Sequence, residues 1–380
     1  MNNKVKIIAF YLPQYHPFKE NDEWWGKGFT EWTNVGKARP LFKGHYQPHV
    51  PADLGYYDLR LPQVREEQVK LAQEAGVYGF CYWHYWFGNG KQLLNLPFDE
   101  VLKSGTPKFP FCLGWANESW QSKIWNKDGA TSVKKVLIEQ TYPGEEDNVN
   151  HFKSFLNAFK DERYIRIEGK PLFYIYKPLL LPNADQFISL WNKLIKESGV
   201  ADSFYFVAQF IKENEINELL SMGFDAVTPS PMPRIQYYYD NLPKFIRGVK
   251  LLYRKMFNKP VVINYCQAIK KIWKDDIDSR ENVIPFIIPN WDHSPRSGNR
   301  GVILFGSTPK KWKELCIGIF KKVRNRKHEE NIVVIKSWNE WGEGNYLEPD
   351  LQYGRQYIHA TKEALEEFDS SKRESRKVTD

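Results

Sequence analysis

The sequence predicts an α/β fold, a single (β/α)8 TIM-type barrel with long loops inserted at the C-terminal face of the strands. Short apolar segments alternate with amphipathic helical segments along most of the 380 residues, which is typical of parallel βαβ units. Eight strands of this kind fit the usual size of a barrel. No Gly-x-Gly-x-x-Gly motif follows any of them, which disfavours a dinucleotide-binding doubly wound sheet.

The predicted elements follow from apolar periodicity and from turn residues. The barrel strands are residues 6–11, 78–85, 110–117, 171–176, 204–210, 224–229, 283–289 and 332–335, with accessory strands at 136–142 and 261–265. The helices are residues 62–75, 147–159, 184–197, 213–222, 310–324 and 353–368. Residues 12–61 form a long aromatic loop, and long loops in compact domains are usually functional. We expect one domain over residues 1–369 and a disordered polar tail over 370–380.

The amino-acid composition indicates which classes of partner the protein is suited to bind. The net charge is +8 and the isoelectric point is about 9.0, which suits an anionic membrane surface, an acidic polymer or nucleic acid. Nucleic acid is the least favoured of these, because no DNA- or RNA-binding motif is present. Aromatic residues make up 16% of the chain, including 14 Trp, more than a core requires. This excess fits a carbohydrate-binding cleft.

Cysteine usage and the N-terminus suggest a compartment. The cysteines are Cys81, Cys112, Cys266 and Cys316, and none lies in a Cys-x-x-Cys pair. The chain runs directly from Met1 into a strand, which indicates no signal peptide, and no apolar run approaches 18 residues. We therefore predict a reduced cytoplasmic protein, located in part at the inner face of the cytoplasmic membrane.

The most informative stretch is Ser337-Trp-Asn-Glu-Trp-Gly-Glu-Gly344, which follows the last apolar strand. Its glycines allow a sharp turn that holds Glu340 and Glu343 three residues apart. Paired carboxylates suit glycoside chemistry, because one can exchange a proton with an oxygen while the other supports the reacting carbon. Trp338 and Trp341 would offer flat faces to sugar rings. The alternative is an acidic surface loop with aromatic anchors.

Other polar and aromatic residues follow the predicted strands, where barrel enzymes carry their catalytic groups. Taken alone, His84 is more often a structural histidine, and Asn117-Glu118 could cap a helix. Their joint placement favours a sugar site. The candidates at strand ends and in the long loop are Tyr11, Tyr15, His16, Glu31, Trp32, Trp83, His84, Tyr85, Trp115, Asn117, Glu118, Trp291, Asp292, Trp338 and Asn339.

A metal site is not predicted, and no cofactor is expected. The eight histidines are scattered, and no His-x-x-x-His or Asp-x-Asp pair lies at a strand end. Asp276-x-Asp278 lies in the charged segment Trp-Lys-Asp-Asp-Ile-Asp-Ser-Arg, which reads as a solvated helix face. This disfavours a metal-dependent transferase of nucleotide sugars.

These motifs together resemble the WbsX family of glycosyltransferases, named from bacterial surface-polysaccharide gene clusters and related to glycoside hydrolase family 99, the endo-α-mannosidases. The resemblance covers nearly the whole chain. Its motifs are Tyr11-Leu-Pro-Gln-Tyr-His16, Gly28-Phe-Thr-Glu-Trp-Thr33, Gly79-Phe-Cys-Tyr-Trp-His-Tyr-Trp-Phe87, Trp115-Ala-Asn-Glu118, Trp291-Asp292, Trp338-Asn-Glu-Trp-Gly-Glu-Gly344 and Glu348-Pro349. It adds Glu348 to the candidate substrate-binding residues, which already include Trp341.

The resemblance implies a family 99-like catalytic barrel without metal and a retaining mechanism through the sugar's own 2-hydroxyl. Glu340 would deprotonate that hydroxyl, which attacks C1 to give a 1,2-anhydro sugar. Glu343 would protonate the leaving oxygen and later deprotonate the incoming one. The related hydrolases have His where this chain has Gly342, which leaves substrate and reaction direction open.

The predicted function is to make or rearrange glycosidic bonds in bacterial surface polysaccharide (O-antigen, capsule or lipopolysaccharide), acting on a glycan or a lipid-linked oligosaccharide. Peripheral contact with an anionic membrane is expected, and no nucleic acid. One alternative is an endo-α-mannosidase-like hydrolase that trims glycans. Another is a barrel that binds glycan without catalysis, which an absent catalytic carboxylate would favour; both Glu340 and Glu343 are present.

Overall fold

Eight strands of the computed structural model, which describes residues 5–125, 132–324, 326 and 331–377, have the order of a (β/α)8 barrel. They are β1 (Val5–Tyr11), β2 (Gly79–Trp86), β4 (Phe111–Trp115), β8 (Lys170–Ile175), β9 (Tyr205–Phe210), β10 (Ala226–Pro229), β12 (Phe286–Ile287) and β15 (Asn331–Ile335). Their hydrogen-bonded order is β10-β9-β8-β4-β2-β1-β15-β12. Chain order is thus kept from β1 to β10, with β15 and β12 on the other side of β1, and the predicted fold class is confirmed.

The pairing of β1 with β15 positions the loop that carries Glu340 and Glu343. The two strands are parallel, with Ile7 opposite Val333 and Ala9 opposite Ile335. All of β15 is buried, as expected for a strand covered on both faces, and this explains its continuous apolar sequence. Beyond the register, the Trp338 amide donates to the Phe10 carbonyl at 2.7 Å. The turn after β15 therefore starts beside the end of β1.

The helices include all six that the sequence predicts and several that it does not. The predicted ones are α3 (Pro62–Glu74), α5 (Glu145–Lys160), α6 (Ala184–Glu197), α7 (Glu215–Ser221), α13 (Pro309–Val323) and α14 (Gln356–Lys377). The additional ones are α1 (Lys19–Trp25), α2 (Glu31–Gly36), α4 (Leu96–Ser104), α8 (Pro231–Asp240), α9 (Lys244–Phe257), α10 (Tyr265–Ile269), α11 (Asp275–Asp278) and α12 (Ser294–Ser297). None of the described helices combines the length and apolar composition that crossing a membrane requires.

Two predicted boundaries differ from the structure. Helix α14 continues to Lys377, whereas a disordered polar tail was expected from residue 370. The segment contains neither Gly nor Pro, which would end a helix. Strand β12 contains only Phe286 and Ile287 of the predicted 283–289. Pro285 and Pro289 flank it, and proline has no amide hydrogen to give to a sheet.

The remaining strands either pair with a barrel strand or form small separate sheets. Strands β3 (Gln92–Leu93) and β7 (Arg166–Ile167) pair with β2 and β8. The predicted accessory strand at 136–142 corresponds to β6 (Ser132–Ile138), which pairs antiparallel with β5 (Trp120–Trp125). The one at 261–265 is β11 (Val261–Asn264), in a sheet with β14 (Val302–Phe305) and β13 (Trp291–Asp292). Strands β16 (Asn339–Glu340) and β17 (Asn345–Tyr346) form a short hairpin.

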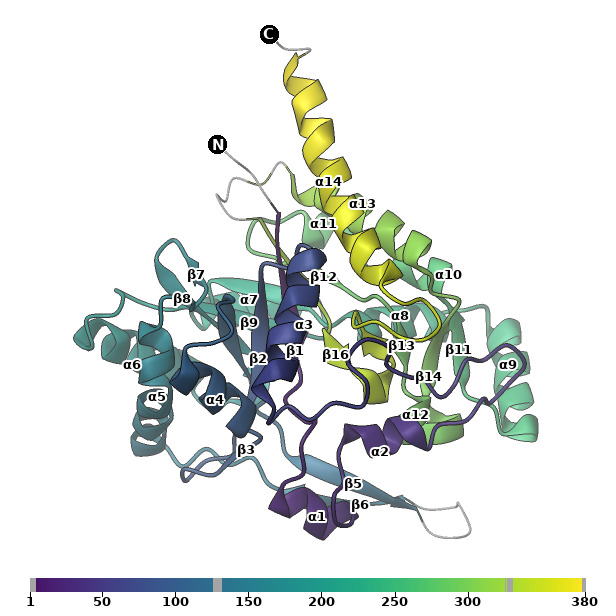
Figure 1. Cartoon of the computed structure of the whole chain (residues 1–380), viewed down its shortest axis with the longest axis horizontal. Coiled ribbons are helices and arrows are strands. Elements are labelled where there is room, and N and C mark those ends of the chain that lie inside the picture. Colours follow the sequence, from purple (N-terminus) through teal and green to yellow (C-terminus); the bar gives the residue numbers. More distant parts are fainter. Residues whose placement is uncertain (1–4, 126–131, 325, 327–330, 378–380) are drawn as a thin grey trace. The chain divides into compact units, whose positions relative to one another are not determined.

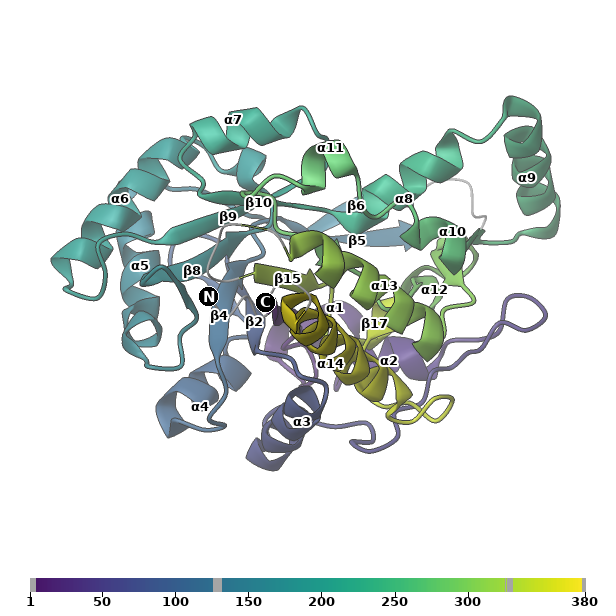
Figure 2. The ribbon, with the colours of Figure 1, turned by 90° about the horizontal axis from the view of Figure 1, so that it is seen from above.

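The chain divides into two compact units. The first unit comprises Met1–Pro17, Gly28–Cys81 and Thr228–Asp380, and the second comprises Phe18–Lys27 and Tyr82–Val227. In the first unit α13 and α14 lie side by side (Figures 1 and 2), and the Trp312 indole donates to Thr361 Oγ1 at 2.8 Å. The second unit has an aromatic core around Trp191, whose ring packs on Phe173 and Phe187. Burying each such ring stabilises the fold by about 1.5–3 kcal/mol.

Candidate active site

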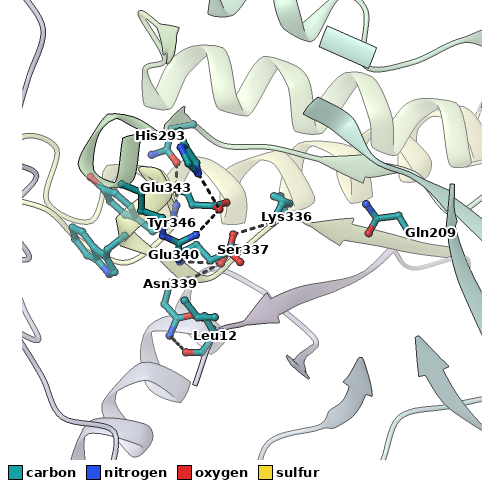
Figure 3. Close-up of polar contacts among 12 residues, drawn as sticks. Leu12, Gln209, His293, Lys336, Ser337, Asn339, Glu340, Glu343 and Tyr346 are labelled. Carbon is teal, nitrogen blue, oxygen red and sulfur yellow. Dashed lines mark hydrogen bonds and ion pairs between the residues drawn. The ribbon is translucent and has the colours of Figure 1, made fainter. Parts of the chain in front are cut away.

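The turn after β15 holds Glu340 and Glu343 in a fixed geometry (Figure 3). Ser337 Oγ accepts hydrogen bonds from the amides of Asn339 and Glu340, at 3.2 and 2.9 Å, which bends the chain at the strand end. Glu340 ends β16, and a single 3₁₀ turn, Trp341–Glu343, carries the second carboxylate. Gly344 then has φ +53°, and a Cβ there would lie 2.7 Å from Asp292 Cβ. Only glycine fits at position 344, because any other residue would have a strained backbone and would overlap Asp292.

Each of the two carboxylates is bound by a different cation. Lys336 Nζ lies 2.8 Å from Glu340 Oε2 (Figure 3). Arg296 Nη1 lies 2.6 Å from Glu343 Oε1. The same guanidinium contacts Glu31 Oε2 through Nη2 at 3.0 Å and Nε at 3.1 Å. His293 Nε2 is a further 3.7 Å neighbour of Glu343 Oε1. Three carboxylates thus face two permanent cations, an arrangement that favours one additional proton in the cluster.

The electrostatics separate the pKa values of the pair. Burial raises the pKa of Glu340 to about 7, although Lys336 acts in the opposite direction. Burial would also raise the pKa of Glu343, but the positive charges of Arg296 and Lys336 outweigh it and lower that pKa to about 2. Between pH about 2 and pH about 7 the pair therefore holds one proton, which resides mainly on Glu340. One acid and one base close together are what a glycosidic-bond reaction requires.

Gly342, which separates Trp341 from Glu343, leaves the space that the Glu31 carboxylate occupies. A Cβ at position 342 would lie 1.9 Å from Glu31 Oε2 and 3.1 Å from Arg296 Nε. Glu31 cannot simply turn into solvent, because its side chain is only 4% exposed and bound by Arg296. Any larger residue at position 342 would therefore displace the Glu31–Arg296 ion pair.

We predict that Gly342→Ala lowers the free energy of unfolding by about 1–3 kcal/mol, the usual cost of overpacking a filled site. Gly36→Ala is the matched control, because a Cβ at Gly36 meets no atom within 4 Å. Urea unfolding of both variants measures the effect. Equal unfolding midpoints for the two variants would show that Glu31 can move aside without any loss of stability.

The two tryptophans of the turn, Trp338 and Trp341, are buried beneath it. Trp338 and Trp341 are 0% and 1% exposed, so they do not present faces to a sugar in this structure, contrary to the expectation from the sequence. Trp341 stacks on Tyr346 with ring centroids 3.7 Å apart, and Trp338 packs on Phe80 at 5.5 Å. Neighbouring rings thus cover the surfaces that a sugar would use. Their role here is to hold the backbone of the carboxylate turn.

A buried hydrogen-bond network fixes the same turn. Glu348 accepts from the Trp341 indole at 2.6 Å, from Gln68 at 2.6 Å and from the Tyr57 hydroxyl at 2.9 Å, and burial raises its pKa to about 7. The Tyr11 hydroxyl donates to Gln68 at 2.7 Å. Asn339 exchanges two hydrogen bonds with the Leu12 backbone, at 2.8 and 3.1 Å.

Tyr15, in the loop that follows β1, is hydrogen-bonded directly to the turn that carries Glu340 and Glu343. Its hydroxyl donates to the Asn339 carbonyl and accepts from the Trp341 amide at 3.0 Å. Burial raises the pKa of Tyr15 well above its usual value, so the phenol stays neutral. Trp32 packs against Tyr15 and Trp341, at 4.7 and 5.6 Å between centroids, and donates its indole hydrogen to the Tyr57 carbonyl. The motif residues of the first loop thus build the support of the carboxylates.

The remaining candidates of the first unit are His16, Trp291 and Asp292. Asp292 Oδ2 accepts from His45 and from Gln47, each at 2.6 Å; burial would raise its pKa, but these hydrogen bonds lower it. Trp291 is half-buried, stacks on His293 at 5.9 Å and lies 5.8 Å from Lys336 Nζ. It is therefore the candidate aromatic whose ring lies beside the charged cluster. His16 is buried, which lowers its pKa.

The other six candidates, Trp83, His84, Tyr85, Trp115, Asn117 and Glu118, belong to the second unit. His84 lies in the aromatic core with its Nε2 2.9 Å from His151 Nε2, and burial lowers its pKa to about 3. The Trp115 indole donates to the Trp86 carbonyl at 3.0 Å. Asn117 accepts from the Lys177 amide at 2.7 Å and donates to the Lys177 carbonyl at 2.9 Å. These three side chains hold the second unit together in this structure.

Three site residues were not predicted from the sequence: Arg296, Lys336 and His293. Lys336 had a signal, because it follows the last strand and stands four residues before Glu340. Arg296 follows Asp292 by four residues in a polar segment, and nothing local distinguishes it from a surface arginine. Within the described ranges, no three His, Cys, Asp or Glu side chains are grouped so that they could hold a metal ion.

Comparison with known proteins agrees with this fold. The family model described as glycosyltransferase WbsX matches residues 7–361. The protein WxcX of Xanthomonas campestris pv. campestris is 34% identical over 369 residues, which are 94% of this chain and 49% of that protein. The chain thus spans about half the length of the curated relatives that it matches.

Two solved structures share the fold. The glycoside hydrolase family 99 endo-α-mannosidase of Bacteroides thetaiotaomicron superposes with a TM-score of 0.52, at 16% identity over 98% of this chain and 99% of that chain. A protein described as glycoside hydrolase-like gives a TM-score of 0.55, at 16% identity over 96% and 94%. The family match over residues 7–361, with the relative at 34% identity, shows that the chain belongs to the WbsX glycosyltransferase family of carbohydrate-active enzymes.

Proposed function

We propose that this chain makes or rearranges glycosidic bonds, with Glu340 and Glu343 as its catalytic pair. The observation that carries the proposal is the buried pair itself: two carboxylates on one turn, bound by Lys336 and Arg296, with pKa values moved apart to about 7 and about 2. A scaffold needs no such arrangement, whereas acid–base chemistry at a sugar does.

The roles proposed for Glu340 and Glu343 are those that the resemblance to glycoside hydrolase family 99 implies. Glu340 takes the proton of the sugar's 2-hydroxyl, and O2 forms a bond to C1 while the bond from C1 to the leaving oxygen breaks. Glu343 gives its proton to that oxygen. The oxygen of an acceptor hydroxyl then forms a bond to C1 while the C1–O2 bond breaks, Glu343 takes the acceptor's proton, and O2 regains a proton from Glu340. Two inversions at C1 give net retention.

These roles require one movement of a proton. In the unliganded site the proton of the pair resides on Glu340, whereas the first step starts with the proton on Glu343. Both forms carry one proton in total, so the proton must pass between the two carboxylates when a sugar enters. The reverse roles, with Glu340 as acid, would need no such transfer. The two assignments differ in an experiment described in the Discussion.

A pH profile follows from the one-proton state. Below pH about 7 and above pH about 2, the pair holds one proton, and raising the pH through 7 removes it from Glu340. We predict that kcat/KM falls as the pH rises through about 7, by up to tenfold per pH unit, because no acid remains in the pair. Initial rates from pH 5 to pH 9 measure this. A rate that rises through pH 7 and stays high would contradict a one-proton pair.

The substrate is proposed to be a glycan or a lipid-linked oligosaccharide of bacterial surface polysaccharide, such as O-antigen, capsule or lipopolysaccharide. Support comes from the WbsX family match and from the net charge of +8, which attracts anionic carriers. The enzyme would work at the inner face of the cytoplasmic membrane through peripheral contact. A mannoside substrate is the hydrolase alternative, since the structural relative of the same fold is an endo-α-mannosidase.

Transfer and hydrolysis can be separated by the acceptor. The reactive intermediate partitions between water and a sugar hydroxyl, so a transferase must hold its acceptor and exclude water. We predict that, with a suitable glycan donor, added acceptor sugar increases the transfer product and suppresses release of free sugar. Free sugar that forms at the same rate at every acceptor concentration would identify a hydrolase.

A further inference from the structure

Helix α9 exposes an unusual amount of apolar surface for a helix of a globular domain. None of its residues from Lys244 to Phe257 is buried. Eight of its apolar or aromatic side chains are between 43% and 82% exposed: Phe245, Ile246, Val249, Leu251, Leu252, Tyr253, Met256 and Phe257. An exposed apolar patch rimmed by polar residues marks a surface that contacts something else.

Four apolar residues and three basic residues of α9 lie on opposite faces of the helix. Phe245, Val249, Leu252 and Met256 follow one another at spacings of four, three and four residues, and so form one stripe along the helix. Arg247, Lys250 and Arg254 share the opposite face, with Lys244 and Lys255 beside it. The helix has five basic residues and no acidic one. This is the pattern of a helix that lies in the plane of an anionic membrane surface.

The segment that follows α9 is hydrogen-bonded to the rest of the unit that carries Glu340 and Glu343. The Lys259 amide donates to the Arg254 carbonyl at 3.0 Å, and its Nζ donates to the Leu41 carbonyl at 2.6 Å. Next along the chain, β11 pairs with β14, which pairs with β13 and therefore with Asp292. In Figure 1 α9 is drawn beside β11 and β14, and in Figure 2 it lies at the outer edge of the ribbon.

The topology places α9 at the catalytic face. Helix α9 lies in the connection that follows β10, the sixth strand of the barrel order. Connections that follow the C-terminal ends of barrel strands are the ones that surround the active site. A membrane bound by α9 would therefore face the side at which substrate enters.

We propose that α9 is an interfacial helix that docks this enzyme on an anionic lipid bilayer. Its 14 residues extend about 21 Å, too short to span a bilayer but long enough to lie along its surface. The apolar stripe enters the acyl boundary, and Lys244 and Lys255, which flank the stripe, contact lipid phosphates. Because the helix has basic residues and no acidic one, it would repel a basic partner and attract a surface of uniform negative charge. The inference rests on the part of the proposed function that places the enzyme at a membrane, and is independent of the catalytic roles.

Co-sedimentation of the full chain with lipid vesicles tests the proposal. We expect binding to vesicles of phosphatidylcholine with phosphatidylglycerol, little binding to phosphatidylcholine alone, and weaker binding as salt is added. Lys244→Ala and Lys255→Ala should each reduce the partition coefficient about 5-fold. Leu252→Glu with Met256→Glu should abolish binding. Glu340→Gln should bind as the wild type does, so loss of catalysis and loss of docking are separable.

Matched variants at other sites serve as controls. Leu351→Glu changes another exposed apolar residue, 66% exposed, and Lys193→Ala removes a charge from α6, where the Lys193 side chain is 69% exposed. Both should bind vesicles as the wild type does. Wild-type binding by the Leu252→Glu/Met256→Glu variant would overturn the proposal. A second result would also overturn it. If the wild type sediments as a dimer, the Leu252→Glu/Met256→Glu variant sediments as a monomer, and vesicles bind neither of them, then α9 contacts a second copy of the chain and not a membrane.

Discussion

Replacing either Glu340 or Glu343 by Gln is expected to leave the fold intact and to reduce turnover by about 10²- to 10⁴-fold, the usual contribution of a general acid or base. Gln has the size of Glu, so packing is kept. Glu340→Gln replaces a carboxyl group that is protonated below about pH 7, and Glu343→Gln leaves the two carboxylates Glu31 and Glu340 facing Lys336 and Arg296. The charges of the cluster can therefore balance in both variants. Loss of stability is therefore not the expected cause of the lost activity.

Circular dichroism and initial rates on the same samples measure both parts of this prediction. Glu67→Gln is the control, because that carboxylate lies on α3 with its side chain 54% exposed and pairs only at the surface with Lys70. It should keep wild-type turnover. If Glu340→Gln is folded and fully active, the proposed pair is wrong.

A donor with an activated leaving group distinguishes the two roles. Such a leaving group departs without protonation, so it needs little help from an acid. With Glu343 as acid, this donor should partly restore turnover to Glu343→Gln and not to Glu340→Gln. Rescue of Glu340→Gln alone would mean that Glu340, whose pKa burial raises to about 7, is the acid of the reaction.

Arg296→Met is expected to lower the free energy of unfolding by about 3 kcal/mol, because it leaves two carboxylates in the interior without their cation. Glu31 and Glu343 are 4% and 15% exposed, and Arg296 contacts both of them at 3.0 Å or less. The same change should raise the pKa of Glu343, since Arg296 is the largest influence that holds it low. Turnover should therefore fall as well, with its pH optimum displaced upward.

Arg60→Met is the matched control for chemical denaturation. Arg60 and Asp58 also form an ion pair at 2.6 Å, but their side chains are 52% and 29% exposed. Surface pairs of this kind contribute about 0–1 kcal/mol. Equal stability losses for Arg60→Met and Arg296→Met would show that burial of the Glu31–Arg296–Glu343 cluster carries no special cost.

The barrel could be predicted because its strands are buried on both faces and so have continuous apolar sequences, as β15 does. Where local chemistry interrupts that pattern, the prediction was inaccurate: β12 is shortened by Pro285 and Pro289. Helix α9 was not predicted, although its sequence has a helical period. Its apolar stripe faces outward, so it does not resemble the core-facing helices that connect barrel strands.

The carboxylate pair could be predicted because both members lie within four residues, at a strand end whose position the sequence indicates. The Glu31–Arg296 ion pair could not, because its residues are 265 positions apart and no local pattern joins them. The burial of Trp338 and Trp341 was missed for a similar reason. Whether an indole faces a ligand or a neighbour depends on Phe80 and Tyr346, which the fold brings into place.

The central claim is that Glu340 and Glu343 catalyse glycosidic-bond chemistry. The most direct test is mass spectrometry of the products formed from lipid-linked and nucleotide-linked sugar donors by the wild type and by Glu340→Gln in parallel. The account predicts a new glycosidic product with the wild type and little or none with the variant. Equal product from both proteins, or glycan binding by the wild type without any product, would contradict it.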